Sequence, residues 1–176
     1  YAQGVGMAYR GKSDEAITAF HNALKLAPTY ASAFRERGIV QLDQGDYEKA
    51  ATDLEQARTA GDNSGETAGN PKGTFSLAWT YYLLGRFDDT IALNRVALKI
   101  SPKEEWIQFN PKGTFSLALA LLASGQVDAA QTEYTNMMTA TAIQVARVKS
   151  AGKEPPGTMW WAIDAGAIDL DALIRC

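Results

Sequence analysis

The nine residues Asn-Pro-Lys-Gly-Thr-Phe-Ser-Leu-Ala occupy positions 70–78 and recur without a change at positions 110–118. An unchanged duplication within one chain indicates an internal repeat, and a repeat with a period of tens of residues predicts an array of similar units. In both copies Asn-Pro is typical of a helix start, with Asn70 or Asn110 as N-cap and Pro71 or Pro111 as the first helical residue. We therefore interpret the chain as a helical repeat protein.

Four glycines separate pairs of segments that have helical spacing of apolar residues. They lie 34, 40 and 40 residues apart, at Gly11, Gly45, Gly85 and Gly125. Pro28 should end the second helix of the first pair, because proline is poorly tolerated inside a helix. The spacing predicts four helix-turn-helix units.

The residues around these turns resemble the tetratricopeptide repeat, whose pattern has a small residue in the first helix, Gly-x-aromatic at the turn, and alanines and an aromatic residue in the second helix. Small residues let adjacent helices approach each other closely. Some positions depart from the pattern, as Ser13, Thr90, Asn94 and Met137 do. The positions that carry the resemblance are Gly11, Ala16, Phe20, Ala23, Pro28, Gly45, Tyr47, Ala50 and Ala57.

The resemblance covers about residues 1–138 and implies an all-α, right-handed superhelical array of four helix-turn-helix repeats. The expected repeats are residues 1–29, 30–60, 70–102 and 103–138. Residues 139–176 are expected to form a helix extension and C-terminal capping helices, because a repeat array needs a cover for its last open face. Trp160 and Trp161 belong to this cap or, alternatively, to a partner surface, since tryptophan is enriched at interfaces.

Three further segments have their own predictions. Residues 61–69 are rich in turn residues and predict an exposed loop. Residues 102–109, which include Trp106, are apolar enough to form a short helix or a packed extension. From Val127 to Lys149 no helix breaker occurs, so the last repeat helix should run to about twenty residues, and Glu154-Pro155-Pro156-Gly157 should then stop the chain.

Composition narrows the class of protein. The 176 residues are 46% hydrophobic and 21% charged, which is typical of globular domains. A formal charge of −3 gives no basic field for nucleic acid, and no apolar run is long enough to span a membrane. The first residue is Tyr1 and no leader is evident, so we interpret the sequence as a piece of a longer protein or a mature form. We expect a soluble protein, cytoplasmic rather than secreted, in a compartment that the sequence does not name.

The sequence contains no residue set that is typical of catalysis or metal binding. His21 is the single histidine and is expected on a solvated helix face, and the single cysteine is Cys176, without an evident base nearby. One histidine and one cysteine do not make a zinc site, and Asp169 with Asp171 is too sparse for calcium. No phosphate-binding loop occurs. We predict no enzyme activity, no metal and no cofactor.

The resemblance implies a concave groove that is lined by the first helix of each repeat and binds a protein or peptide. By register, Tyr1, Val5, Tyr9, Glu36 and Asp43 also point toward this groove. Two alternatives remain: the chain's own loops cover the aromatic residues and use them as core, or the patch serves self-association. The candidate groove residues are Arg35, Ile39, Lys72, Phe75, Trp79, Tyr82, Lys112, Phe115 and Leu119.

One subclass of the family holds the C-terminal carboxylate of chaperones with lysine, asparagine and arginine residues. The corresponding positions here are Tyr1, Val5, Glu36, Lys72 and Ser76, of which only Lys72 fits. Because Glu36 would repel a carboxylate, we predict that the chain is not such a clamp. The expected function is a non-enzymatic interaction scaffold that binds a partner peptide or helix, with homo-oligomerisation or service as an accessory domain of a larger protein as alternatives.

Overall fold

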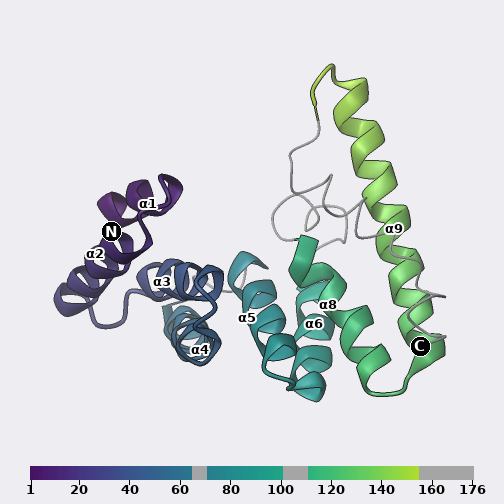
Figure 1. The fold of residues 1–176 in the computed structure, drawn as a ribbon, viewed down its shortest axis with the longest axis horizontal. Coiled ribbons are helices and arrows are strands. Elements are labelled where there is room, and N and C mark those ends of the chain that lie inside the picture. Colours follow the sequence, from purple (N-terminus) through teal and green to yellow (C-terminus); the bar gives the residue numbers. More distant parts are fainter. Residues whose placement is uncertain (65–70, 101–110, 155–176) are drawn as a thin grey trace. The chain divides into compact units, whose positions relative to one another are not determined.

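The computed structural model describes residues 1–64, 71–100 and 111–154. Within these ranges the chain forms eight helices and no strand, so the prediction of an all-α repeat array is confirmed (Figure 1). The helices are α1 (Ala2–Tyr9), α2 (Ser13–Leu26), α3 (Ala31–Asp43), α4 (Tyr47–Ser64), α5 (Pro71–Leu83), α6 (Phe87–Ile100), α8 (Pro111–Ala123) and α9 (Val127–Ser150).

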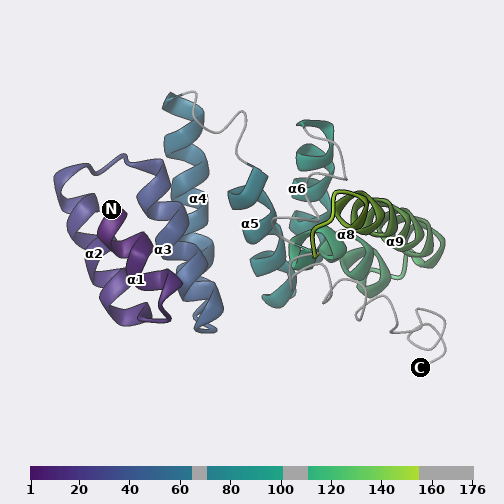
Figure 2. The same cartoon turned by 90° about the horizontal axis from the view of Figure 1, so that it is seen from above.

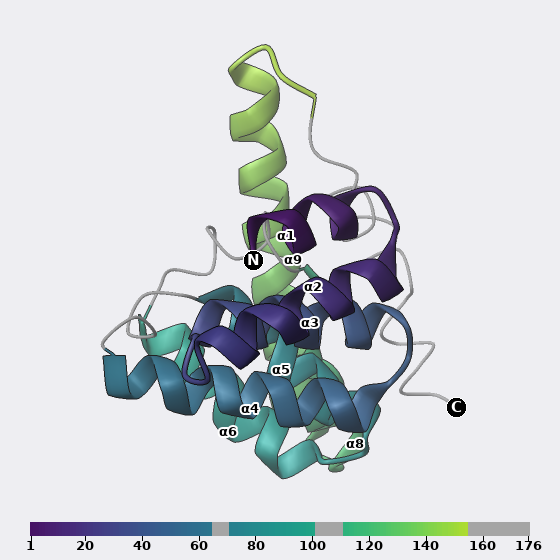
Figure 3. The ribbon, with the colours of Figure 1, turned by 90° about the vertical axis from the view of Figure 1, so that its left-hand side faces the viewer.

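The chain divides into two compact units, Tyr1–Leu84 and Gly85–Cys176. In the first unit α1 packs on α2, α2 on α3, α3 on α4 and α4 on α5, and Figures 2 and 3 show α2, α3 and α4 following one another. In the second unit α8 packs on both α6 and α9. The border between the units lies at the glycine turn of the predicted third repeat. This division does not test the four repeat boundaries, which stay a prediction.

The four glycines predicted at turns all have a left-handed backbone conformation. Their φ angles are 72° at Gly11, 84° at Gly45, 73° at Gly85 and 75° at Gly125. After Gly45, the N–H of Asp46 donates to the carbonyl of Gln41 at 2.9 Å, and equivalent bonds close the turns after Gly11 and Gly125. This closure satisfies carbonyls at the helix end and needs a residue that tolerates positive φ.

Small residues set the distance between paired helices. A Cβ atom at Gly4 would lie 2.8 Å from Cε1 of Phe20, and one at Gly38 would lie 2.8 Å from Cγ of Leu54. Larger side chains would therefore force α1 from α2, or α3 from α4, because protein interiors have little empty space. The second helix of each pair also carries a small or medium residue that is completely buried, at Ala16, Ala50, Thr90 and Ala130.

One helix end differs from the expectation and another agrees with it. Helix α4 continues to Ser64, so the segment predicted as a loop from residue 61 is helical over its first four residues. A glycine inside a helix costs only about 1 kcal/mol relative to alanine. The helix therefore continues through Gly61, which is buried. Helix α9 runs for 24 residues from Val127 to Ser150, one residue beyond the expected Lys149, and Gly152 with a φ of 69° follows it. Residues 65–70, the Trp106 segment and the predicted C-terminal cap lie outside the described residues.

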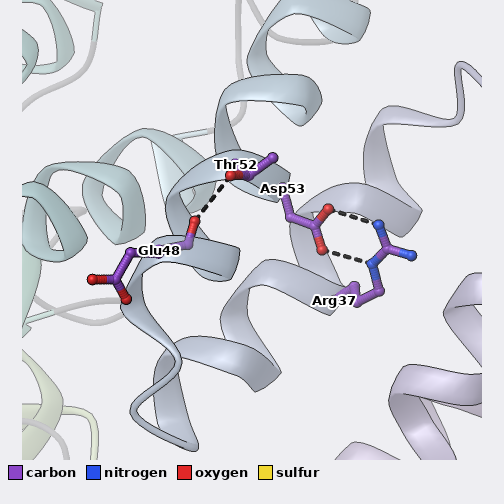
Figure 4. A network of polar contacts seen from close by, with 4 residues as sticks. All are labelled: Arg37, Glu48, Thr52 and Asp53. Carbon is purple, nitrogen blue, oxygen red and sulfur yellow. Dashed lines mark hydrogen bonds and ion pairs between the residues drawn. The ribbon is translucent and has the colours of Figure 1, made fainter.

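An ion pair ties α3 to α4 in the first unit. Nε and Nη2 of Arg37 donate to the two carboxylate oxygens of Asp53 at 2.6 and 2.7 Å, and both side chains are largely buried (Figure 4). A two-point guanidinium–carboxylate contact fixes both position and orientation. Arg37 also lies over the ring of Phe34, with its Cζ 5.7 Å from the ring centroid. On α4, the hydroxyl of Thr52 donates to the carbonyl of Glu48 at 2.9 Å.

The second unit contains a buried amide where the repeat pattern has an aromatic residue. Asn94 is completely buried on α6, and its Nδ2 donates to the carbonyl of Thr90 at 3.0 Å and to Oγ of Ser116 at 2.9 Å. The hydroxyl of Thr90 in turn donates to the carbonyl of Arg86. These bonds satisfy the Nδ2 of Asn94 and the hydroxyl of Thr90, whereas the buried Oδ1 of Asn94 makes no hydrogen bond with the described residues.

Candidate functional site

In the first unit, the first helix of each repeat has a partly exposed apolar residue at the same position of the repeat. Val5 on α1, Ile39 on α3 and Trp79 on α5 are separated by the repeat steps, and each side chain is half-buried. Helix α5 also packs directly on α3. An apolar side chain that is half-buried in every repeat marks the face on which α1, α3 and α5 present their side chains.

A pocket of about 200 Å³ opens on this face between α1 and α3. Its lining combines apolar side chains with two carboxylates, Glu36 and Asp43. The ring of Tyr9 is 86% exposed, which is unusual for a large aromatic side chain. No Lys, Arg or His is among the lining residues, which are Val5, Ala8, Tyr9, Ser13, Glu36, Ile39, Val40 and Asp43.

Arg35 lies beside the pocket and is held by neighbours in the first unit. Its Nε donates to Oε1 of Glu36 at 3.2 Å, and its Nη2 lies 3.4 Å from Oγ of Ser32. The stem of Arg35 passes so close to α5 that a Cβ atom at Gly73 would lie 3.2 Å from its Cδ. Arg35 therefore helps to join α3 to α5, and only a small part of its side chain is exposed.

Tyr1 packs at the start of the same face. Its ring centroid lies 6.0 Å from that of Phe20 and 5.0 Å from that of Tyr30. Burial raises the pKa of the Tyr1 hydroxyl above its ordinary value of 10.0, and the nearby charge of Glu36 raises it further, whereas Arg35 lowers it. The hydroxyl is therefore neutral at physiological pH, and the charges around it are those of Glu36 and Arg35.

Helix α5 adds an aromatic pair. The rings of Trp79 and Tyr82 are stacked, with centroids 5.3 Å apart and an angle of 21° between their planes. Both side chains are half-buried, whereas the neighbouring Tyr81 is buried and donates its hydroxyl to Oε1 of Glu55 at 2.7 Å. Trp79 and Tyr82 thus offer rigid apolar area at the surface of α5.

Two predicted groove residues belong to the core. Phe75 is completely buried and Phe115 is 4% exposed. Phe115 packs on Met137 and Ala140 of α9 and lies edge-on to Tyr134, with ring centroids 5.7 Å apart. A partner can contact only exposed atoms, so we leave both phenylalanines out of the candidate surface.

The remaining predicted groove residues lie in the second unit, in the pocket or outside the described residues. Leu119 is half-buried on α8 in the second unit, and the side chains of Lys72 and Lys112 lie outside the described residues. The pocket combines Ile39 with Val5, Tyr9, Glu36 and Asp43, which the register had assigned to the groove. The repeat pattern did not single out Ala8, Ser13 or Val40, because their place in the pocket depends on how α1 and α3 pack.

The second unit has a broader hollow of about 480 Å³ between α6, α8 and α9. Its floor is apolar and its charged residues have both signs, with arginine and lysine on α6 and carboxylates on α9. The sequence analysis did not predict this hollow. Its lining residues are Arg95, Leu98, Lys99, Leu117, Leu121, Asp128, Ala129, Thr132 and Glu133.

The part of the chain that the structure describes contains no group of three or more His, Cys, Asp or Glu residues placed to hold a metal ion. Across the same residues, no helix is both long and apolar enough to cross a membrane. His21 is exposed on α2, as expected.

Family models confirm the resemblance that the turn residues carry. One tetratricopeptide repeat model matches residues 1–66 and 35–105, and a second model of the same repeat matches residues 111–134. The chain belongs to the tetratricopeptide repeat family. Members of this family are generally non-enzymatic scaffolds for protein interactions. Membership supports a general role of this chain as a protein-protein interaction scaffold, and the fold suggests protein or peptide partners.

Solved structures of repeat proteins are similar in fold. MamA from Desulfovibrio magneticus RS-1, in a form that starts at residue 41, is 23% identical with a TM-score of 0.68, covering 82% of this chain and 75% of that one. Another crystal structure of MamA is 14% identical with a TM-score of 0.66, covering 98% of this chain and 97% of that one. YrrB, described as a repeat protein with an unusual peptide-binding site, is 17% identical with a TM-score of 0.65, covering 97% and 86%. A search of the curated proteins found no match.

Proposed function

We propose that the chain binds a peptide segment of a protein partner on the face formed by α1, α3 and α5. The observation that carries this proposal is the pocket between α1 and α3, whose lining includes apolar side chains and the exposed Tyr9. Concave apolar sites with a few polar groups are the usual form of a binding site. Ile39 in the pocket and the Trp79–Tyr82 pair on α5 are the apolar anchors.

A comparison supports the proposal but does not carry it. YrrB, whose fold is similar, is described as having a peptide-binding site, so a repeat array of this kind can hold a peptide. Burial of each anchor would contribute roughly 1.5–3 kcal/mol. The ordering of the peptide offsets much of this gain. We therefore expect affinities in the micromolar range.

The proposal can be tested with peptides of random sequence. A displayed library is panned on the immobilised native chain, an enriched peptide is synthesised, and its affinity is measured by isothermal titration calorimetry. Tyr9→Ala, Ile39→Ala and Trp79→Ala should each weaken binding about tenfold, the equivalent of 1.4 kcal/mol. Val96→Ala is the matched control, because Val96 is 52% exposed on α6 of the second unit.

Each variant is first checked for native helicity by circular dichroism. A library without enriched peptides, or enriched peptides that bind all three variants as tightly as the native chain, would contradict the proposal. Such results would remove the α1–α3–α5 face as a binding site and leave the hollow of the second unit as the next surface to examine.

Self-association is a second use that exposed apolar residues favour. Leu26 on α2 is 89% exposed and Val96 on α6 is also largely exposed, and both lie on second helices rather than on the proposed binding face. Large exposed apolar side chains are enriched where proteins associate. Sedimentation equilibrium over a wide range of concentrations tests this alternative, and a monomer at every concentration would exclude it.

A further inference from the structure

We infer that the pocket between α1 and α3 selects a lysine or arginine side chain of the bound segment. This inference rests on the proposed function and makes it more specific. The pocket has two carboxylates, Glu36 and Asp43, and no basic residue in its lining. An opposite charge on the ligand would complement this wall, and charge complementarity favours one partner over another.

The ends of two helices add to the negative potential of the pocket. Asp43 is the last residue of α3, and Ala8 and Tyr9 are the last two residues of α1. Neither helix has a basic side chain in its last turn. The C-terminal end of a helix carries partial negative charge and favours a cation. Arg10, the C-cap residue of α1, already places a cation at that helix end, whereas the last turn of α3 and its C-cap residue Gln44 carry none, so a ligand can supply one there.

The shape of the pocket fits one long basic side chain. Val5, Ile39 and Val40 form an apolar surface against which the methylene groups of lysine or arginine can pack while the charged end stays near water. The exposed ring of Tyr9 offers its face to the same charge, and such cation–π contacts contribute about 0.5–1 kcal/mol at exposed sites. A pocket of about 200 Å³ is too small for a whole helix.

The charged groups around the pocket do not contribute equally. Glu36 is bound by Arg35 at 3.2 Å, so part of its charge is already compensated. Asp14, at the start of α2, accepts a hydrogen bond from Nε2 of Gln44 at 3.0 Å, and Glu15 pairs with Lys12 at 3.5 Å. Asp43 is exposed at the end of α3. A ligand therefore reaches Asp43 more easily than the half-buried Glu36.

The test compares peptide preferences with and without the two carboxylates. The same random library is panned on the native chain, on the Glu36→Gln, Asp43→Asn double variant, and on a control in which Glu48→Gln and Asp88→Asn remove the same charge at exposed positions on α4 and α6. One enriched peptide is then synthesised with each basic residue changed in turn to norleucine. Affinities are measured by calorimetry at low and high salt.

The native chain and the control should select peptides enriched in lysine or arginine, and the double variant should lose this enrichment. The norleucine change at one position should weaken binding to the native chain about three- to tenfold, and it should have little effect on binding to the double variant. The difference in affinity for the native chain between the original peptide and its norleucine variant should shrink at high salt.

Failure of this inference can be distinguished from failure of the proposed function. Peptides that depend on Tyr9 and Ile39 but have no basic preference would overturn the selection of a cation and leave the binding face intact. Peptides with a basic preference that survives in the double variant would also overturn it. An absence of enriched peptides, or peptides insensitive to Tyr9→Ala and Ile39→Ala, would overturn both statements.

Discussion

Helices α5 and α8 start with the same eight residues, Pro-Lys-Gly-Thr-Phe-Ser-Leu-Ala, but belong to different compact units. The last four of these residues are buried in both helices, and the pattern of burial remains the same over the next four positions. Those next residues differ: Trp-Thr-Tyr-Tyr in α5 and Leu-Ala-Leu-Leu in α8. The shared residues thus define which face is buried, and the residues that follow define the chemistry of each helix.

The contacts of the two helices show the consequence. In α5, Tyr81 donates its hydroxyl to Glu55 of α4, and Trp79 stacks on Tyr82 at the surface. In α8 the polar contact comes from the shared serine, because Asn94 of α6 donates to Ser116. Tyr81 follows the shared stretch, so α5 owes this polar contact to a residue that α8 does not have.

The largest expected effect tests whether the shared phenylalanine has the same role in both copies. Phe75→Ala and Phe115→Ala should each lower the free energy of unfolding by about 3–5 kcal/mol, because each removes a large buried side chain. Urea denaturation followed by circular dichroism measures the loss. Val96→Ala, at an exposed position, should change it by less than about 0.5 kcal/mol. Markedly unequal losses for the two phenylalanines would show that equal burial does not mean equal packing.

Loss of the buried amide should affect the second unit alone. Asn94→Ala should lower the free energy of unfolding by about 1–3 kcal/mol, because the two buried hydrogen bonds from Asn94 to Thr90 and Ser116 are lost. Denaturant unfolding is again the measurement, with the exposed Asn22→Ala as the matched control. An unchanged stability would mean that Asn94 is dispensable and that α8 depends on apolar packing only.

The polar contact between α5 and α4 can be removed by deleting one oxygen atom, that of the Tyr81 hydroxyl. Tyr81→Phe should cost about 1–2 kcal/mol, because the 2.7 Å hydrogen bond to the Glu55 carboxylate is lost while the ring remains. Tyr9→Phe serves as the control, since that ring is almost fully exposed. Equal melting temperatures for Tyr81→Phe and the native chain would contradict the importance of this bond.

The smallest expected effect on stability comes from making the surface of α5 resemble that of α8. Trp79→Leu removes a stacked pair that contributes about 0.5–1.5 kcal/mol, so thermal unfolding should shift only slightly. Peptide binding should weaken more clearly than stability, and Leu119→Met on α8 should leave both nearly unchanged. A variant that unfolds readily but binds normally would assign Trp79 to the core rather than to the binding face.

Much of the fold was predictable because its signals are local. Gly11, Gly45, Gly85 and Gly125 were identified as turns from their spacing, and their positive φ angles follow from the absence of a side chain. Pro71 and Pro111 were expected at the first helical position and begin α5 and α8. The binding face was only partly predictable. The register named Ile39, Glu36 and Asp43 together with Phe75, which is buried, because register gives the direction of a side chain but not what covers it.

The sequence by itself determined that this chain is a helical repeat protein, where its turns lie and which residues are small enough for helices to pack closely. These properties depend on backbone geometry and side-chain size, which each residue carries with it. The tertiary structure decided which apolar residues are core and that Thr90 and Asn94 can stand where the repeat pattern has an alanine and an aromatic residue. It also decided that Glu36 and Asp43 share one pocket with Tyr9. Those outcomes depend on the distances between helices that are far apart in the sequence, and such distances arise only when the helices pack.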